Sequence, residues 1–303
     1  MTSGWVSKIA HASWEDGPGL RTVVFLSGCN LRCQWCHNPE SIPRNGQLMY
    51  YADKCIGCGE CASVCSCHAI EGNRHLWDGR QCMRCRKCAD ACLGEALQLS
   101  ARQMDAEQVI SEILRDKAYY QDEGGVTFSG GECLLQPDFL GEVLKACRLA
   151  GIHTCIETAL NVDFSVILPL LDWIDLVIAD IKLMDPAQHL RYTGADNRKI
   201  LDNLRRIAAL SKDLLIRIPL IPGVTDTIEN LTTTADFVAE LPYIHGKQIE
   251  LLRYNPFADN KYRALGKSYH DFGLPQSNGQ IQQLLQILSS RQPDIRFLYT
   301  PPA

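Results

Sequence analysis

The chain has 303 residues, is 46% hydrophobic and carries a formal net charge of −5, which is typical of a globular protein with a substantial core. Its scattered basic residues and acidic balance argue against a nucleic-acid-binding surface. With no signal-peptide pattern at the N-terminus and no apolar run near the ~20 residues that cross a bilayer, we expect a cytoplasmic protein without a membrane segment.

The spacing of apolar residues predicts short strands that alternate with amphipathic helices. Strands are expected at 22–26, 125–129, 152–156, 176–180, 214–218, 248–252 and 295–299. Helices are expected at 104–120, 139–150, 166–171, 198–211, 228–241 and 281–289. This order predicts right-handed β-α-β units and a parallel sheet, with too few units for a closed eight-stranded barrel. The predicted fold is therefore an α/β, partial (β/α)6 TIM-like barrel.

Residues 48–100 differ in character from the rest, because they are dense in cysteine and lack long apolar periodic runs. We therefore expect residues 1–47 to begin the barrel and to hold its first cysteine loop. Residues 48–100 would form a ferredoxin-like insert, and residues 101–303 would complete the barrel. Chemistry in parallel barrels lies at the carboxyl ends of the strands, so the functional motifs should fall there.

Fifteen cysteines need an explanation in a chain without an export signal. Twelve of them lie between Cys29 and Cys92. In a reducing compartment, clustered cysteines are metal ligands or redox groups more often than disulfides. The cysteine pattern therefore indicates metal sites.

The first cysteine group follows the apolar run at 22–26 and has the spacing C-x3-C-x2-C, formed by Cys29, Cys33 and Cys36. A 4Fe–4S cluster is normally held by four thiolates, so three ligands leave one iron open to a substrate or cofactor. Spacing alone leaves two alternatives, a zinc loop or a cluster whose fourth thiolate comes from elsewhere in the chain.

Two further groups repeat the spacing C-x2-C-x2-C-x3-C, which is that of bacterial two-cluster ferredoxins. In that arrangement the fourth cysteine of each run ligates the other cluster. The first cluster would take Cys55, Cys58, Cys61 and Cys92, and the second Cys65, Cys82, Cys85 and Cys88. A pair of zinc knuckles is the alternative. Ser66 and Leu93 replace the usual proline after the fourth cysteine, and Cys67 could exchange with Cys65 as a ligand.

The first cysteine group, with Trp35 before its third cysteine, resembles the signature of the radical S-adenosylmethionine (SAM) enzymes. The flanking motifs Asp16-Gly-Pro-Gly-Leu-Arg21 and Cys36-His-Asn-Pro39 are similar to one branch, the glycyl radical enzyme activating enzymes related to pyruvate formate-lyase activating enzyme. The resemblance covers nearly the whole chain. It implies a cluster with one open iron, SAM as cofactor and the partial barrel.

The same resemblance implies a set of SAM-binding residues at the strand ends. Ser129-Gly-Gly-Glu132 is similar to the family's GGE motif, so Gly130, Gly131 and Glu132 would meet the amino group of SAM; a plain tight turn is the alternative. Asp180 and Lys182 match an Asp-Leu-Lys motif, for which an ordinary ion pair is the alternative. Glu157 stands where the family has Asp in an Asp-Thr-Asn-Gly motif, and this departure leaves the expected monovalent cation near SAM open. The remaining expected SAM contacts are Trp35, Arg217 and Asn255.

Two of these positions carry further expectations. Arg217 lies within a predicted buried strand, where a guanidinium needs a partner; the resemblance implies the carboxylate of SAM, and a structural salt bridge is the alternative. Asn255 stands where pyruvate formate-lyase activating enzyme has a histidine. Asp16 is expected to meet the glycine-containing peptide of the partner enzyme.

The resemblance implies three 4Fe–4S clusters and SAM, whose reductive cleavage yields a 5′-deoxyadenosyl radical that takes hydrogen from a glycine of the partner enzyme. An external one-electron donor such as flavodoxin or ferredoxin is also implied. Two alternatives stay open. One is a radical SAM enzyme that acts on a small molecule or another peptide. The other is a non-catalytic electron carrier, which would leave the GGE motif unexplained.

Overall fold

The computed structural model describes residues 2–72, 74–242 and 246–299, and its largest element is a nine-stranded sheet in the order β13-β12-β11-β10-β9-β8-β2-β1-β7. Seven of these strands are parallel to one another. The sequence predicts these same seven, which are β2 (Arg21–Leu26), β8 (Gly125–Gly130), β9 (His153–Thr158), β10 (Leu176–Asp180), β11 (Asp213–Leu220), β12 (Lys247–Arg253) and β13 (Ile295–Tyr299). The prediction of an α/β fold with a mostly parallel sheet is confirmed.

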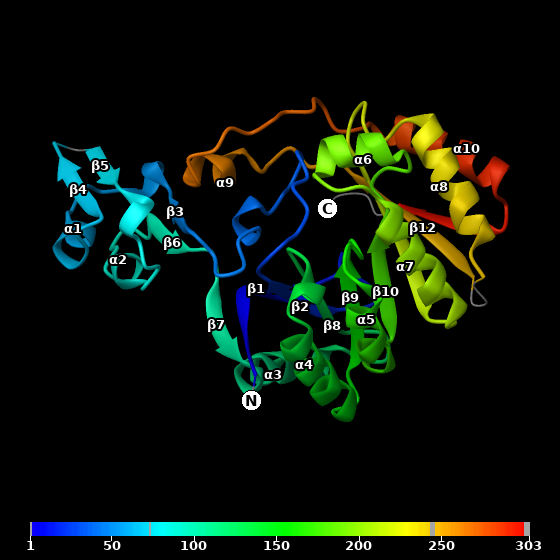
Figure 1. The fold of residues 1–303 in the computed structure, drawn as a ribbon, viewed down its shortest axis with the longest axis horizontal. Helices are drawn as coiled ribbons and strands as arrows, with labels where there is room; N and C mark the ends of the chain where they lie inside the picture. Colours follow the sequence, from blue (N-terminus) through cyan, green and yellow to red (C-terminus); the bar gives the residue numbers. More distant parts are fainter. Residues whose placement is uncertain (1, 73, 243–245, 300–303) are drawn as a thin grey trace.

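Helices connect the parallel strands and pack beside the sheet (Figure 1). Each predicted helix corresponds to one or more elements of the structure, which are α3 (Ala106–Arg115), η4 (Lys117–Tyr119), α4 (Pro137–Leu149), α5 (Phe164–Ile167), η6 (Leu168–Trp173), α7 (Arg198–Ala209), α8 (Ile228–Glu240) and α10 (Asn278–Arg291). The helix expected at 104–120 is shorter than predicted. Asp105 caps its first turn, and the chain leaves the α-helix after Arg115. Among the described helices, none is long and apolar enough to cross a membrane.

Two antiparallel strands of the sheet and two short α-helices outside the cysteine-dense residues 48–100 were not predicted. They are β1 (Ser3–Ser13), β7 (Arg102–Asp105), α6 (Pro186–Thr193) and α9 (Asp259–Ala264). β1 pairs antiparallel with β2 and with β7, and it is half-buried with many polar residues. It therefore lacks the continuous apolar run by which buried parallel strands are recognised. The two helices are short and largely polar.

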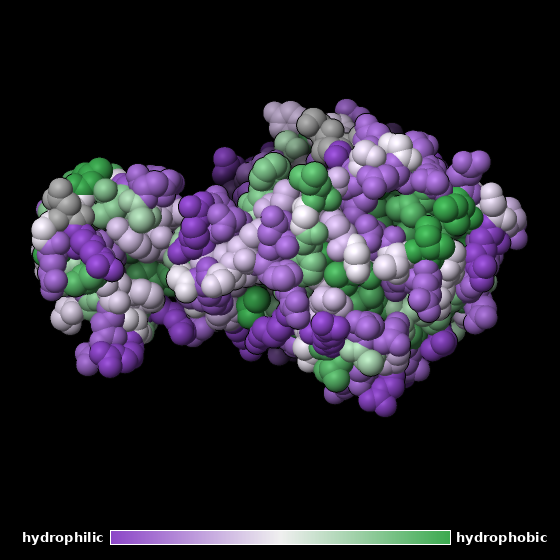
Figure 2. All heavy atoms as spheres, turned by 90° about the horizontal axis from the view of Figure 1, so that it is seen from above, coloured by the Kyte–Doolittle hydropathy of each residue, from purple (hydrophilic) through white to green (hydrophobic). Residues whose placement is uncertain are grey.

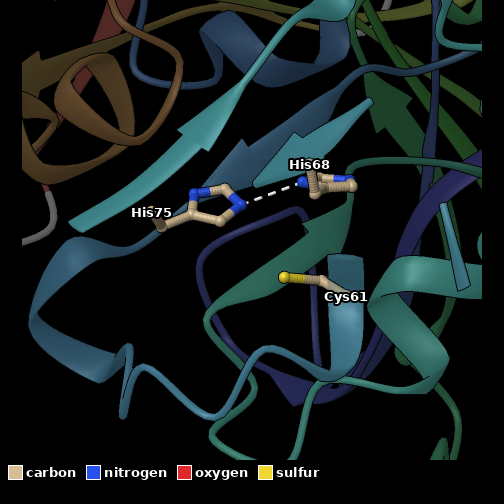
Figure 3. Close-up of side chains that lie close together, drawn as sticks. All are labelled: Cys61, His68 and His75. Carbon is tan, nitrogen blue, oxygen red and sulfur yellow. Dashed lines mark hydrogen bonds between the residues drawn. The ribbon is translucent and has the colours of Figure 1, made fainter. Parts of the chain in front are cut away.

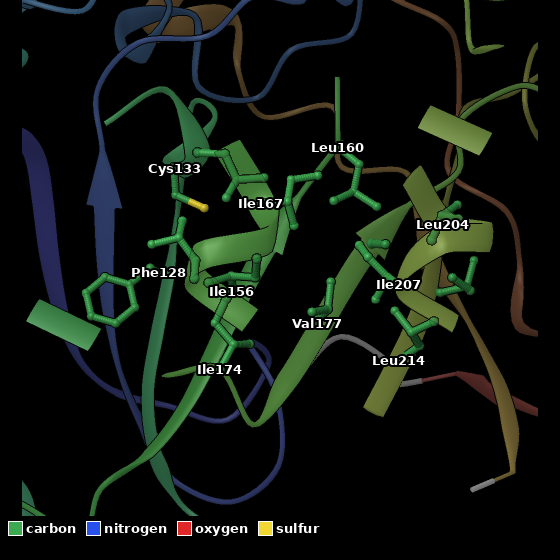
Figure 4. Packing of buried hydrophobic residues seen from close by; sticks show 14 of the residues in the cluster. Phe128, Cys133, Ile156, Leu160, Ile167, Ile174, Val177, Leu204, Ile207 and Leu214 are labelled. Carbon is green, nitrogen blue, oxygen red and sulfur yellow. The ribbon is translucent and has the colours of Figure 1, made fainter. Parts of the chain in front are cut away.

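The main hydrophobic core lies between the sheet and its helices, as Figure 4 shows. Phe128 and Ile156, from neighbouring parallel strands, are fully buried together with Ile167 and Leu204 from the helices. Side chains from the strands and from the helices fill this core, so their packing fixes the curvature of the sheet. That curvature fixes where the carboxyl ends of the strands lie, and so where the functional motifs can meet.

Residues 48–100, here called the cysteine-rich segment, lie outside the main sheet (Figures 1 and 2). The segment begins and ends side by side, because β3 (Leu48–Tyr50) pairs with β6 (Leu97–Leu99). Its buried hydrophobic cluster has only four members, Leu48, Cys61, Cys88 and Leu97. Its other elements are η2 (Ala52–Lys54), α1 (Glu60–Val64), β4 (His68–Glu71), β5 (Arg74–Trp77), η3 (Gly79–Gln81) and α2 (Lys87–Asp90).

Candidate active site and cysteine cavities

A pocket lies at the carboxyl ends of the parallel strands, and the first cysteine group forms part of its wall. Residues from the ends of six parallel strands (β2, β8, β9, β10, β11 and β12), or from the loops that follow them, line this pocket, although they are far apart in the sequence. The residues of the sequence analysis that line it are Asp16, Cys29, Cys33, Trp35, Cys36, Gly130, Gly131, Glu157, Asp180, Lys182 and Asn255. Two expected contacts, Glu132 and Arg217, are not among the lining residues.

The cysteine loop is held in place by the chain around it. The amide of Gln34 donates to the carbonyl of Tyr192 at 3.0 Å, at the end of α6. The ring of Trp35 packs against Tyr192 and Phe272, with centroid distances of 6.1 Å to each. The Tyr262 hydroxyl donates to the carbonyl of Cys36 at 3.1 Å. The loop therefore presents its three thiols from a fixed backbone.

The chemistry of these thiols fits an iron–sulfur cluster. Burial raises the pKa of the Cys33 thiol to about 12 and that of the Cys36 thiol to about 11. Such thiols keep their protons until a metal ion displaces them. Burial lowers the pKa of Lys182, but its neighbours Asp180 and Cys33 outweigh burial and raise that pKa. A charged ammonium beside three thiolates offsets the negative charge that a cluster would bring.

Gly130 and Gly131 are required by backbone packing. A Cβ on Gly130, whose φ is +117°, would lie 2.2 Å from the carbonyl oxygen of Leu26, and a Cβ on Gly131 would lie 2.2 Å from that of Gly28. The amide of Gly131 donates to Leu26 and that of Glu132 to Gly28. The motif is thereby fastened to the start of the cysteine loop. Gly130 and Gly131 therefore form a tight turn and also line the pocket, so the two interpretations are compatible.

Glu132 is fully buried just behind the pocket wall. Its Oε1 accepts hydrogen bonds from the Thr158 hydroxyl at 2.7 Å and from the amide of Leu134 at 3.2 Å. Its Oε2 accepts from the amide of Ala159 at 3.0 Å. Burial raises the pKa of this carboxyl, against the effect of these hydrogen bonds. In the structure Glu132 ties together the loops after β8 and β9, and its contact with SAM remains a prediction.

Arg217 lies at the centre of a buried ion-pair network. Its Nε donates to Glu250 and one terminal nitrogen donates to Glu157, both at 2.7 Å. The other terminal nitrogen donates to the carbonyl oxygen of Glu15 at 2.5 Å. This is the structural salt bridge that the sequence analysis kept as its alternative, and the carboxylate of SAM as partner remains a prediction.

Glu157 lines the pocket with both of its oxygens engaged. One accepts from Arg217, and the other accepts from the Ser129 hydroxyl at 2.5 Å. Burial raises the pKa of Glu157, but the adjacent Arg217 outweighs burial and lowers it. A carboxylate already paired with an arginine is a poor ligand for the monovalent cation that the resemblance implies. The ion pair of Glu157 with Arg217 therefore argues against Glu157 as a ligand of that cation.

The remaining lining residues are placed by short local contacts. The Lys182 ammonium donates to Asp180 at 2.7 Å, and both lie at the end of β10. Asn255 accepts through its side-chain oxygen from the amide of Phe257 at 3.0 Å, and its side-chain amide nitrogen has no hydrogen-bond partner within the described residues. Asp16 enters the pocket from the loop after β1, where burial raises the pKa of its carboxyl and the Ser13 hydroxyl donates to it.

Two cavities in the cysteine-rich segment gather the other cysteines. The first is lined by Cys55, Cys58, Cys61 and Cys92. The second is lined by Cys65, Cys67, Cys82, Cys85 and Cys88. Each cavity therefore holds three cysteines from one run and the fourth from the other run, as the ferredoxin spacing implies. Cys67 shares the second cavity with Cys65, so the question of which one is the ligand stays open.

A pair of histidines lies beside the first cavity. His68 and His75 are hydrogen-bonded through Nδ1 and Nε2 at 2.9 Å, and the Cys61 thiol points toward them (Figure 3). Ligand atoms of the three side chains lie within 4.8 Å of one another, close enough to hold a metal ion. A single ion there would compete with a cluster for Cys61. The second ring nitrogen of His68, Nε2, is buried and has no hydrogen-bond partner among the described residues.

Several residues around the pocket were not identified in the sequence. The Lys261 ammonium, on α9, donates to Asn38 at 2.7 Å and to Glu40 at 2.8 Å, and so fastens the segment after Cys36. No local pattern marks this lysine. Glu250 did carry a signal, because an acidic residue in a buried strand needs a cationic partner, and the neighbouring predicted strand contains Arg217.

Comparison with known proteins shows the family of the chain. Residues 23–237 match the model of the radical SAM superfamily. The chain is 39% identical to the (2S)-3-sulfopropanediol dehydratase activating enzyme of Klebsiella oxytoca, over 94% of this chain and 93% of that protein. It is 38% identical to the indoleacetate decarboxylase activating enzyme of Tractidigestivibacter scatoligenes, over 93% of each.

Among solved structures, Streptococcus suis SuiB bound to precursor peptide SuiA resembles the chain with a TM-score of 0.57 and 12% identity, covering 92% of this chain and 48% of that one. At this identity the likeness concerns the fold alone. The family match and the two relatives carry the assignment. The chain belongs to the radical SAM superfamily and, within it, to the glycyl radical enzyme activating enzymes, which use radical SAM chemistry to generate a glycyl radical on a partner enzyme.

Proposed function

We propose that this enzyme activates its partner through one SAM-binding 4Fe–4S cluster, held by Cys29, Cys33 and Cys36, at the mouth of a partial (β/α)6 barrel. The observation that carries the proposal is the pocket itself, where these three cysteines meet Gly130, Gly131, Asp180 and Lys182. When bound, the cluster and SAM supply the chemistry of reductive C–S bond cleavage, which yields methionine and a 5′-deoxyadenosyl radical.

The residues of the chain would hold and orient the two cofactors. Trp35, Gly130 and Gly131 would form a wall of the pocket against which SAM can lie. Asn255 would offer its side-chain amide to SAM as a hydrogen-bonding group. Lys182 and Asp180 place a cation and an anion at the same mouth, 2.7 Å apart. We assign Glu132 and Arg217 to positioning these walls, because their carboxylate and guanidinium groups are hydrogen-bonded to the loops and strands that form the pocket.

Residues 48–100 would form a ferredoxin-like insert with two further 4Fe–4S clusters. The sets of cysteines that line the two cavities support this proposal, since they agree with the two ligand sets expected from spacing. The first cluster would take Cys55, Cys58, Cys61 and Cys92, and the second Cys65, Cys82, Cys85 and Cys88. These clusters would pass electrons from an external donor such as flavodoxin or ferredoxin toward the SAM-binding cluster.

The partner would be a glycyl radical enzyme of the dehydratase, decarboxylase or lyase kind. The relatives are named for the activation of a dehydratase and of a decarboxylase, and the chain is almost equally similar to both. Similarity therefore supports the class of partner and does not select one member. Asp16, half-buried in the loop after β1 and lining the pocket, would contact the glycine-containing peptide of the partner.

Anaerobic reconstitution with iron and sulfide, followed by dithionite and SAM, tests the proposal. We expect about twelve irons per chain, because three clusters of four irons are proposed, and formation of 5′-deoxyadenosine. With a panel of candidate partners, a glycyl radical signal in electron paramagnetic resonance (EPR) should appear with one of them. Full iron content without SAM cleavage would favour an electron carrier, and cleavage coupled to a small molecule would favour the other alternative.

A further inference from the structure

The two cysteine runs fold alike but differ at two left-handed backbone positions. In the first run these positions are Gly57, with φ of +68°, and Gly59, with φ of +80°. In the second run they are Arg84, with φ of +55°, and Arg86, with φ of +69°. Glycine adopts this conformation readily, whereas a residue with a Cβ does so at an energetic cost.

Packing does not explain why the second run has arginines. No atom lies within 4 Å of a Cβ built on Gly57 or Gly59, so both choices of residue fit the space that the fold leaves. Within the described residues, the side chain of Arg84 makes no hydrogen bond or ion pair. Arg86 pairs only with exposed Asp90 at 3.2 Å, and exposed pairs contribute little stability. Strain without a structural benefit points to function.

The arginines change the surface around the second cavity. Arg84, Arg86 and Lys87, here called the basic rim, all line this cavity and all are exposed. Among the described residues that line the first cavity there is no Lys, Arg, Asp or Glu. The basic rim therefore marks one of two otherwise similar cavities, in a chain whose net charge is −5.

An exposed apolar side chain adjoins the basic rim. Met83 lines the same cavity and is 87% exposed, and Cys85 next to it is also exposed. In Figure 2 the cysteine-rich segment stands out from the main body and carries apolar and polar side chains side by side. A flexible methionine followed closely by two exposed arginines is typical of protein interfaces, where both residue types are enriched.

We infer that the basic rim, together with Met83, is the docking surface for an acidic one-electron carrier protein that reduces the chain at the second cavity. This inference rests on the proposed function, which places a cluster there. The carrier would lose one electron for each SAM cleaved and would transfer no atom. Positive charge at the rim would steer the acidic carrier toward the exposed edge of the site.

Two double variants separate charge from backbone conformation. Arg84→Gln with Arg86→Gln removes the charges and keeps side chains at the strained positions. Arg84→Gly with Arg86→Gly removes both charge and strain, and it reproduces the residues of the first run. Since the first run folds with glycine at both positions, the glycine variant should fold and take up iron like the unaltered enzyme. An exposed control, Lys117→Gln with Arg296→Gln, removes two charges from the main body.

The measurements are binding of flavodoxin, an acidic one-electron carrier, and 5′-deoxyadenosine formation with either reduced flavodoxin or dithionite. Both rim variants should bind flavodoxin about 10-fold more weakly at low salt, and this difference should shrink at high salt. Their rates with limiting flavodoxin should fall in parallel, while their rates with dithionite should stay unchanged. The control should match the unaltered enzyme.

Unchanged flavodoxin binding in both rim variants would overturn the inference, as would a loss equally large in the control. A loss in only one rim variant would also overturn it, because that result would assign the effect to backbone conformation. Failure of the unaltered enzyme to cleave SAM with dithionite would instead count against the proposed function. The two failures are therefore distinguishable.

Discussion

The pocket at the strand ends and the two cavities of the cysteine-rich segment are built in opposite ways. The pocket gathers residues that are distant in sequence, and a buried network around Arg217 fixes its walls. The cavities gather residues that are close in sequence, on short elements whose hydrophobic cluster has four buried members among the described residues. We therefore expect the structure of the pocket to depend on the folded sheet. We expect the structure of the cavities to depend on the metal groups proposed to bind in them. This difference agrees with the proposal that the pocket is the site of chemistry and that the two cavities hold electron-transfer clusters.

The largest expected effect is on chemistry at the pocket. Changing Cys33→Ala removes one of the three proposed cluster ligands and should reduce dithionite-driven SAM cleavage to the background rate. The matched control is Cys155→Ala, a buried thiol outside all three groups, which should keep cleavage. Quantifying 5′-deoxyadenosine in both variants checks the prediction. Retained cleavage in the Cys33 variant would exclude this loop as the SAM-binding site.

The next largest effect concerns the stability of the sheet. Changing Arg217→Met removes the buried guanidinium that pairs with both Glu157 and Glu250, which should lower the free energy of unfolding by about 3–5 kcal/mol. Arg263→Met removes an exposed pair with Asp259 at 3.0 Å and should cost about 0–1 kcal/mol. Chemical denaturation of both variants gives the comparison. Equal effects would mean that the buried network does not fix the pocket.

Removal of iron should affect the cysteine-rich segment and the sheet differently. Because the segment has so small a core, we expect it to lose its structure when a chelator removes the metal, as small metal-dependent domains do. Trypsin should then cleave rapidly at exposed sites such as Arg80, Arg84 and Arg86, while the sheet stays intact. Mass spectrometry of the fragments checks this order. Equal resistance of the segment with and without iron would show that it folds without metal.

The smallest effect concerns the two cysteine runs. Changing Gly57→Arg and Gly59→Arg places side chains at left-handed positions with open space around them. Each change should cost about 1 kcal/mol of stability, with iron content unchanged, because the second run tolerates arginine at the same positions. Thermal unfolding and iron analysis of the holoenzyme measure both. Loss of iron from the first site would show that the two runs are not equivalent.

The parallel sheet could be predicted from the sequence because its strands are buried on both faces and so appear as continuous apolar runs. β1 could not, since it is antiparallel, half-exposed and rich in polar residues. The pocket-lining residues at the strand ends were found because parallel topology brings those ends together. The partners of Glu132 and Arg217 were not found, because they depend on how side chains of different strands meet inside the fold.

The most direct test of the division between the two regions is SAM cleavage by Cys58→Ala combined with Cys85→Ala, measured with dithionite and with reduced flavodoxin. These thiols are the exposed members of the two cavities. We predict that dithionite, which can reduce the pocket cluster directly, still supports 5′-deoxyadenosine formation, whereas flavodoxin no longer does. Loss of dithionite-driven cleavage in a variant whose pocket cluster keeps its EPR response to SAM would contradict the account.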